Sequence, residues 1–552
     1  MDYNLINEIR PKLNAFDLSH NHFTTMDMGK LYPVAWLECV PCDVIRLDLQ
    51  ALIRVQPMVA PILNNLTCDL HAFFVPTRLL WKDWEDFITT IEQGTIPPKN
   101  YEGRPPVWCE SDTDPNRVAP DIDTSPHSLW DMLGFSRKFK KNAMKELRPS
   151  DFLRRAYYCI WNEWFRDENL QEPINYFDSI KQDLCYRAWK KDYYTAAYYA
   201  RQKGTAPAIP LTGTGSVKWD SPYLERLDNT TVHIRNAYGE LGTTKDIGVR
   251  NFAGSLMGAS LYFKDSPSDR ANLSTEALGD NREKFLEYLN SNKFDLSSVG
   301  TFTVDDMRDM FSIQKFMTKL MMAGSRYIEF LQSQFGVSPS DARLQIPERI
   351  GGSSFNIQIS EVIATAQTQV GDNVNPQGNQ SGHGLSVSSG SLGSYKVVEF
   401  GYIMILANIQ PPSVYTDRLP RSMFRRTLLE QFNPHFVNLS FQSIHNREIY
   451  ADGSEKDNEI FAYAGRYDEL RECGSYVSGD LYDKLDYYLN FRKFAQKPSF
   501  NSDFIECKPD NNIFKVQDEP PFICNFYFDI KALRPLPLVS EPGLIDHVYG
   551  GI

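Results

Sequence analysis

Near both ends of the chain, apolar residues recur at every second position, and this pattern constrains the fold more than any other feature. Between residues 44 and 55, Ile45, Leu47 and Leu49 alternate with mostly polar residues. Between residues 522 and 529, the apolar residues Phe522, Cys524, Phe526 and Phe528 alternate with Ile523, Asn525, Tyr527 and Asp529. A two-residue period is typical of a strand with one buried face. We therefore expect an antiparallel sandwich whose first and last strands pair, with long excursions between them.

Three further segments read as strands. Residues 31–37 and 66–75 are rich in apolar residues and have prolines near their ends, where a missing N–H is tolerated. Residues 397–409 (VVEFGYIMILANI) form a nearly continuous apolar run. Such a run indicates a strand that is covered on both faces.

The middle of the chain has a different character. Apolar residues recur at helical spacing in residues 151–164, and a second helix is expected to begin at Thr303 and to end near Gly336. Residues 204–300 are rich in Gly, Ser, Thr, Asn and Asp, which predicts an inserted surface subdomain. Residues 367–394 have almost no apolar periodicity, and we predict a long loop there.

Composition excludes several classes of protein. The 552 residues are 42% hydrophobic and 13% aromatic, which suits a large folded core. A net charge of −12 argues against a general nucleic-acid or membrane-surface binder, because such proteins carry a basic field. The sequence has no signal-peptide pattern and no apolar run of transmembrane length, so we expect a cytoplasmic origin and reduced cysteines.

Common catalytic and metal-binding motifs are missing from the sequence. Cys39 and Cys42 form a lone C-x-x-C without a second pair at zinc spacing, and His20 and His22 read as a polar loop. No phosphate-binding loop, zinc-protease motif or nucleophile elbow is present. A jelly-roll glycosidase stays open as an alternative, since its two carboxylates need no fixed spacing. A carbohydrate- or receptor-binding module is the other alternative.

One stretch stands out electrostatically, at residues 137–155. It holds eight cations against Glu146 and Asp151, which gives +6 there and −18 in the remainder of the chain. The cations are Arg137, Lys138, Lys140, Lys141, Lys145, Arg148, Arg154 and Arg155. Interleaved aromatic residues suit phosphate neutralisation with base stacking on single-stranded DNA, although a solvated helix face or a basic subunit contact would look the same. A second cluster with the same interpretations comprises Arg418, Arg421, Arg425 and Arg426.

Several longer segments match one known family in chain order. They include FDLSHNHFTTMDMGKLYPV at residues 16–34, RVQPMVAP at 54–61, FVPTRLLW at 74–81 and IWNEWFRD at 160–167. The most specific stretch runs from RYIEF at 326–330 through DARLQIPE at 341–348 to Gly351 and Gly352. RPLP at 534–537 and PGLIDH at 542–547 close the chain. Together these segments resemble the major capsid protein of the Microviridae, and in particular its gokushovirus-like branch.

The resemblance implies a mainly β protein, an eight-stranded antiparallel viral jelly roll with long helical and loop insertions. Residues 1–203 and 301–552 would share one core, and residues 204–300 would form a threefold protrusion for host attachment. It further implies a T=1 icosahedral shell around circular single-stranded DNA, assembled in the bacterial cytoplasm, with no catalytic site, cofactor or metal. The implied partners are other copies of the chain, the genome, a small basic DNA-binding protein, minor spike or pilot-type virion proteins and a host surface receptor, without membrane insertion.

Overall fold

We describe the chain from a computed structural model. The structure describes residues 12–89, 106, 108, 121–139, 149–205, 304–323, 326–335, 345–363 and 380–538, together with short strands elsewhere. Backbone contacts divide the chain into two units, residues 1–203 with 318–552, and Gly204–Met317. The first unit contains every site discussed below.

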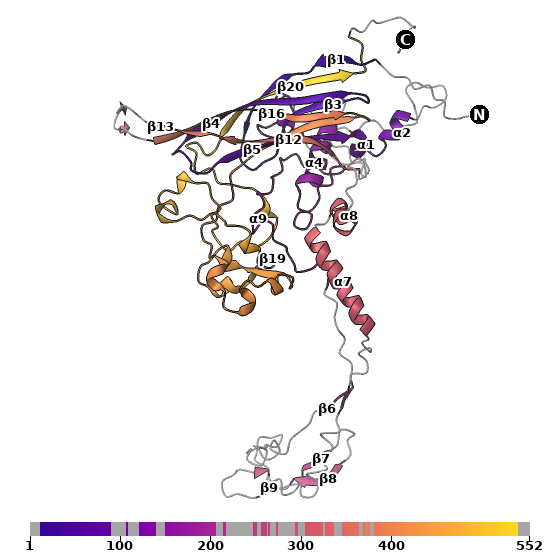
Figure 1. Ribbon diagram of the computed structural model, residues 1–552, viewed down its shortest axis with the longest axis vertical. Helices are drawn as coiled ribbons and strands as arrows, with labels where there is room; N and C mark the ends of the chain where they lie inside the picture. The colour runs from indigo at the N-terminus through magenta and orange to yellow at the C-terminus, as the bar shows by residue number, and fades with distance from the viewer. Residues whose placement is uncertain are drawn as a thin grey trace, which may run out of the picture. The chain divides into compact units, whose positions relative to one another are not determined.

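Two antiparallel sheets form the body of the first unit (Figure 1). The larger sheet contains β1 (Asn14–Asp17), β2 (His20–Met26), β4 (Val44–Met58), β13 (Ile359–Ile363), β16 (Gln380–Lys396) and β20 (Phe522–Arg534). The smaller sheet contains β3 (Tyr32–Cys39), β5 (Leu66–Pro76), β12 (Glu348–Ile357) and β17 (Gly401–Gln410). The strand orders are β1-β20-β4-β16-β13, with β2 also on β20, and β12-β5-β17-β3.

The connectivity of these strands is that of a jelly roll. Taking β2, β3, β4, β5, β12, β16, β17 and β20 in chain order, the strands pass between the two sheets at every step except from β5 to β12. Both β1 and β2 pair with β20, with Phe16 opposite Ala532 and Phe23 opposite Asn525. The predicted antiparallel sandwich with paired first and last strands is therefore confirmed.

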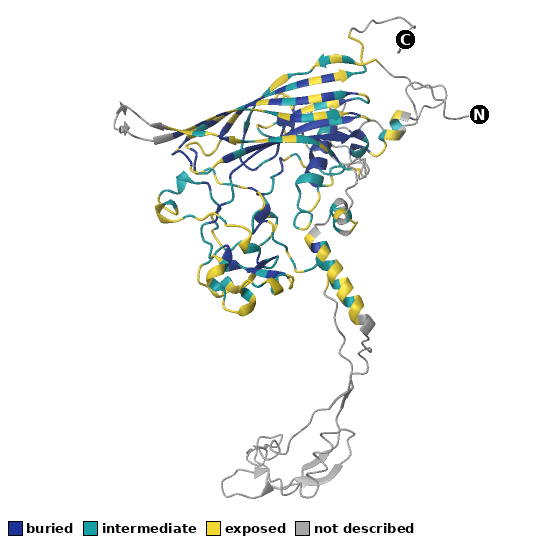
Figure 2. Cartoon of the chain, in the orientation of Figure 1, coloured by how far each residue is buried: buried dark blue, intermediate teal, exposed yellow. Residues whose placement is uncertain are grey.

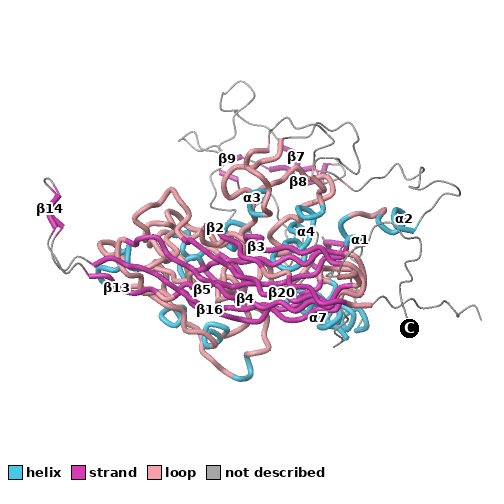
Figure 3. The backbone as a smooth tube through the Cα atoms, turned by 90° about the horizontal axis from the view of Figure 1, so that it is seen from above, coloured by secondary structure: helices cyan, strands magenta, loops and turns pink. Residues whose placement is uncertain are grey.

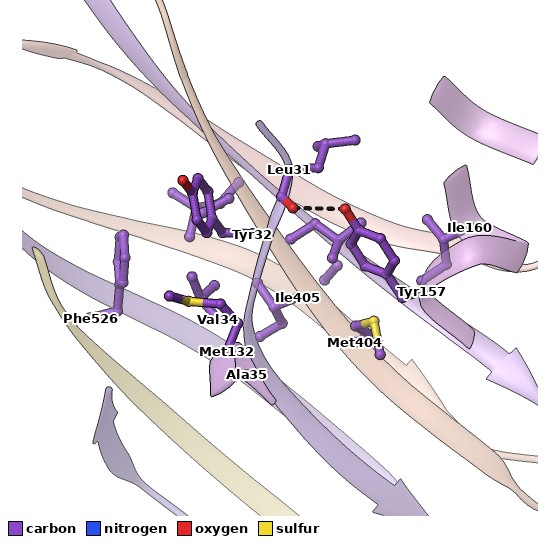
Figure 4. Packing of buried hydrophobic residues seen from close by; sticks show 14 of the residues in the cluster. Leu31, Tyr32, Val34, Ala35, Met132, Tyr157, Ile160, Met404, Ile405 and Phe526 are labelled. Carbon is purple, nitrogen blue, oxygen red and sulfur yellow. Dashed lines mark hydrogen bonds between the residues drawn. The ribbon is translucent and has the colours of Figure 1, made fainter. Parts of the chain in front are cut away.

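The alternation in sequence becomes burial in the fold. In β4, Leu47, Leu49 and Ile53 are buried between the sheets, and the residues between them face away (Figure 2). The core gathers side chains from both sheets and from the helices, including Tyr32, Met132, Ile405 and Phe526 (Figure 4). One buried polar group there is satisfied, because the Tyr157 hydroxyl donates to the Leu31 carbonyl oxygen at 2.9 Å.

Short helices cover the smaller sheet and its edges. They are α1 (Thr77–Leu80), α2 (Trp84–Thr89), α3 (Leu129–Met132) and α4 (Phe152–Ile160), which continues as the π-helix η2 (Trp161–Phe165). The helix predicted at residues 151–164 corresponds to α4 and η2. The helix predicted from Thr303 corresponds to α7 (Val304–Ala323), followed by α8 (Tyr327–Phe335).

A second lobe of the first unit is built mostly from loops. It contains the hairpin of β18 (Gln442–His445) and β19 (Ile460–Ala464), α9 (Ser502–Ile505) and several 3₁₀ turns, and β19 and α9 are marked in Figure 1. The strands of the two sheets, among them β4, β5, β16 and β20, run side by side in Figure 3. The second lobe has a small separate core, which includes Tyr194, Tyr415, Ile444 and Phe504. The turns are η6 (Arg421–Phe424), η7 (Leu428–Glu430), η8 (Pro434–Phe436), η9 (Asn446–Glu448), η10 (Glu455–Asn458), η11 (Asp468–Leu470), η12 (Gly479–Leu481) and η13 (Asp486–Tyr488).

The remaining strands are short. Those in Gly204–Met317 are β6 (Thr214–Ser216), β7 (Ile247–Arg250), β8 (Leu256–Leu261), β9 (Phe263–Lys264), β10 (Asn272–Leu273) and β11 (Lys293–Asp295). Beyond that unit, β14 (Thr368–Val370) pairs with β15 (Asn373–Asn375). The insertion predicted at residues 204–300 falls within the second unit, and its side chains lie outside the described residues.

The prediction of a long loop at residues 367–394 was wrong over most of its length. Residues 380–396 form β16, which pairs with β4 from Gly382 opposite Met58 to Lys396 opposite Val44. Gly and Ser have low strand propensity, but here their small size matters more. A Cβ on Gly384 would overlap the side chain of Val55, and one on Gly390 would overlap Ser353 of the other sheet. Close packing against two strands therefore overrides the local preference.

Candidate nucleic-acid interface

The basic stretch at residues 137–155 divides into buried and exposed parts. Arg154 and Arg155 are 1% and 0% exposed, so the structure corrects the prediction that these two contact DNA. Arg137 and Lys138 are exposed, the Arg137 side chain by 58%. Lys140, Lys141, Lys145 and Arg148 lie outside the described residues.

Arg154 and Arg155 share one carboxylate inside the protein. Asp151, at the start of α4, accepts from the Arg154 Nε at 2.6 Å and from the Arg155 Nε at 2.9 Å. Arg155 also donates to the Leu80 carbonyl oxygen at 3.0 Å, and Arg154 lies over the Trp108 ring at 4.9 Å. These partners satisfy the guanidinium groups, as buried charges require. The pair anchors α4 to the loops around it.

Arg137 is held in a fixed position at the surface by Asp131. Its Nε and Nη2 donate to the two Asp131 oxygens at 2.6 and 2.8 Å, a bidentate geometry. Burial alone would raise the pKa of Asp131, but the Arg137 guanidinium holds it below its usual value. Asp131 is itself positioned by α3, where the Ser128 hydroxyl caps the Asp131 amide at 3.3 Å.

This ion pair borders a hollow of about 570 Å³ on the outer face of the larger sheet. Phe23, Arg54, His127 and Asn525 line it together with Arg137. Strand register explains the arrangement, because Asn525 of β20 lies opposite both Phe23 of β2 and Leu52 of β4. Residues at alternate positions of three strands thus reach one surface.

The lining of the hollow suits a nucleotide. Phe23 is 72% exposed and its ring offers a face for stacking, while Arg54 supplies positive charge. The Arg137 guanidinium is paired with Asp131, but it stays 58% exposed, unlike the buried arginines of the second cluster. Asn525 Oδ1 and His127 Nδ1 are buried and have no hydrogen-bond partner among the described residues. Burial lowers the pKa of His127, which favours its neutral ring. Phe23, Arg54 and Asn525 were not predicted as site residues from the sequence. The two-residue period of their strands was the signal that places them on the outer face of the larger sheet.

The second arginine cluster is largely engaged within its own lobe. Arg421 pairs with Glu448 at 3.0 Å, Arg425 pairs with Glu469 at 2.7 Å, and Arg418 donates to the Gly474 carbonyl oxygen. The Arg421 and Arg425 side chains are mostly buried. Their positive charge is therefore compensated internally, and this cluster is a weaker candidate for phosphate binding.

Two cysteines and two histidines are the remaining candidates from the sequence. Cys39 is buried, Cys42 is exposed, and both are unpaired thiols. His20 and His22 lie in β2, so the prediction of a polar loop there was wrong. Among the residues that the structure describes, no group of three or more His, Cys, Asp or Glu could hold a metal ion, and no helix is long and apolar enough to cross a membrane.

Comparison with known proteins decides the family. The model of the family "Capsid protein (F protein)" matches residues 7–544. The chain belongs to this capsid protein family. Capsid protein VP1 of Chlamydia phage 1 is 30% identical, over 96% of this chain and 95% of that protein. The VP1 proteins of Bdellovibrio phage phiMH2K and Spiroplasma virus 4 are 28% and 27% identical, each over 96% of this chain and over 95% and 94% of their own lengths.

The comparison confirms the resemblance drawn from the sequence. A capsid protein is a structural component of the virion, and neither the family nor these relatives are enzymes. The glycosidase and carbohydrate-binding alternatives are therefore not favoured.

Proposed function

We propose that this capsid protein assembles with copies of itself into a T=1 icosahedral shell that encloses a circular single-stranded DNA genome. Family membership over residues 7–544 carries the proposal, and the jelly-roll connectivity agrees with it, because viral capsid domains commonly use that fold. Residues 204–300 would serve host attachment. A small basic DNA-binding protein, minor spike or pilot-type proteins and a bacterial receptor would be further partners.

Within this function, the hollow beside Arg137 would hold part of the genome. Phosphates would pair with Arg137, Lys138 and Arg54, and a base would stack on Phe23. Lys140, Lys141, Lys145 and Arg148 follow Lys138 in sequence and would extend the contact. A local contact of this kind reconciles DNA packaging with the overall charge of −12.

Charge-neutral substitution tests this contact. We expect Arg137→Gln with Lys138→Gln, Lys140→Gln and Lys141→Gln to lower the DNA content per particle, because several phosphate partners are removed. Absorbance and quantitative PCR on purified particles measure that content. Arg46→Gln is the matched control, since Arg46 is exposed on the same sheet face and pairs with Asp48. Full DNA content in the multiple variant would contradict the assignment.

A further inference from the structure

A second cavity lies on the face of the smaller sheet that points away from the larger sheet. In β5, the Phe74 ring contacts Tyr395 of the larger sheet, with ring centroids 4.9 Å apart. Because side chains alternate along a strand, His71 and Phe73 point to the opposite side, where Phe73 contacts Trp164 of η2 at 5.4 Å. Here β5, β12 and η2 border a space of about 1060 Å³, which we call the small-sheet cavity. It is separate from the hollow proposed for DNA, which lies on the other side of the sandwich.

The charges around the small-sheet cavity do not cancel one another. Its lining contains three ion pairs: Arg187 with Asp69 at 2.6 Å, Arg326 with Glu168 at 2.8 Å, and Lys191 with Asp167 at 3.9 Å. The other charged residues of the lining are Arg166, Lys190, Arg349 and Glu329, and no ion pair joins them to any residue that the structure describes. Three cations against one carboxylate leave +2 in a chain whose net charge is −12. The cavity therefore attracts an anion.

Two nitrogen-bearing side chains meet beside Gly352. The Arg349 Nη2 and the His71 Nδ1 each lie 3.1 Å from the position that a Cβ on Gly352 would occupy. The His71 Nε2 is buried and has no hydrogen-bond partner among the described residues. Burial and the charge of Arg187 lower the pKa of His71 to about 4, so its ring is neutral at pH 7 and can donate from Nε2. An exposed guanidinium beside an imidazole N–H suits the oxygens of a phosphate group.

Two further polar groups of the lining have no partner within the described part of the chain. Gln410 is 1% exposed, and its Nε2 donates to the Ala188 carbonyl oxygen at 2.8 Å, while its Oε1 is buried without a hydrogen bond. The Nε of Arg166 is also buried without one. Since an unsatisfied buried polar group is costly, a ligand that reaches these atoms gains free energy from them.

We infer that the small-sheet cavity binds a small phosphate monoester. Such a group carries about −2 at pH 7, which matches the +2 of the lining, and its oxygens accept from Arg349 and His71. A DNA phosphate carries only one negative charge. The organic part of the ester lies against Trp164 and Phe165, and its hydroxyl or amino groups donate to Gln410 Oε1. The volume is close to that of small-molecule sites in general. This inference goes beyond shell formation and does not depend on it.

Isothermal titration calorimetry on the purified full-length chain tests the inference. The probes are glucose 6-phosphate, adenosine monophosphate, inorganic phosphate and a short oligothymidylate. We expect at least one of the two monoesters to bind at least about tenfold more tightly than inorganic phosphate, because its organic part adds apolar contact. The tighter monoester identifies the source as a sugar or a nucleotide. Inorganic phosphate or oligothymidylate binding as tightly as the monoesters, or no binding of either monoester, would overturn the inference.

Substitution of Arg349 locates the site. Arg349→Gln should weaken monoester binding at least about tenfold, because a charged donor is lost, and should leave the melting temperature unchanged, because the side chain is exposed. Arg46→Gln, at an exposed arginine of the larger sheet, is the matched control and should bind as the wild type does. Particles of Arg349→Gln should form at wild-type yield with full DNA content, so this inference and the shell proposal are tested separately. An Arg349→Gln chain that binds the monoester normally, or that no longer forms particles, would overturn the assignment.

Discussion

At the scale of single residues, Asp151 has the largest structural role in the basic stretch. Its carboxylate pairs with two guanidinium groups, and all three side chains are excluded from solvent. Removing one partner of a buried ion pair is costly because the remaining charge stays buried without compensation. The charges of Arg154 and Arg155 thus contribute to folding rather than to the surface potential.

Substitution of Asp151 tests this role. We expect Asp151→Asn to lower the free energy of unfolding of the subunit by about 3–5 kcal/mol. Urea denaturation followed by circular dichroism measures it. Asp48→Asn is the control, because it breaks an exposed pair with Arg46 and should cost less than about 1 kcal/mol. Equal effects of the two substitutions would contradict the buried role.

Sequence reasoning at this scale found the charged stretch but could not sort its members. Arg154 and Arg155 follow Asp151 by three and four residues, a helical spacing that indicates local ion pairs. Whether such pairs are buried depends on what packs over α4, including Trp108 and the chain near Leu80. Those contacts join segments far apart in sequence, and periodicity alone does not contain them.

At the scale of elements, β12 and β16 approach each other closely across the two sheets. A Cβ on Gly351 would overlap the carbonyl oxygen of Leu392, and the register of β12 shifts at the same point. Gly351 therefore permits a close approach of two backbones. This requirement gives a physical reason for a glycine that otherwise looks out of place in a strand.

Filling that space should weaken the sandwich. We expect Gly351→Ala to reduce the free energy of unfolding by about 1–3 kcal/mol, as overpacking does, and to lower the melting temperature in calorimetry. Ser389→Ala, at an exposed position of β16, should stay within about 0.5 kcal/mol of the wild type. An unchanged melting temperature for Gly351→Ala would show that the strands can separate there without cost.

The strands that could be predicted are those whose burial alternates or is continuous. β4 and β20 alternate because one face of each is buried. β17 is mostly apolar because it is buried along nearly its whole length between β3 and β5. β16 could not be predicted, because its Gly and Ser residues have low strand propensity. They occur there because larger side chains would overlap the neighbouring strands. The hollow beside Arg137 likewise depends on register between three strands from opposite ends of the chain.

At the scale of the whole molecule, the chain combines a jelly-roll unit with a second unit at Gly204–Met317. We expect replacement of residues 204–300 by a short Gly/Ser linker to leave the strands folded, with a melting temperature close to that of the wild type. Binding of the resulting particles to host cells should be lost. A truncated chain that does not fold would contradict the view of this segment as an inserted subdomain.

An acidic chain can enclose DNA if its positive charge is concentrated in one place. Its net charge is −12, while in the proposed DNA contact Arg54 and the cations from Arg137 onward would supply a local positive surface. Self-association into a symmetric shell would then place that surface repeatedly around the genome. The proposed DNA contact and host attachment both depend on shell formation.

Electron cryomicroscopy of the purified, expressed protein tests shell formation. We expect closed particles of one size with T=1 icosahedral symmetry, in which the jelly-roll units form a continuous wall. Monomers or small open oligomers under all assembly conditions, with the subunit correctly folded, would contradict it.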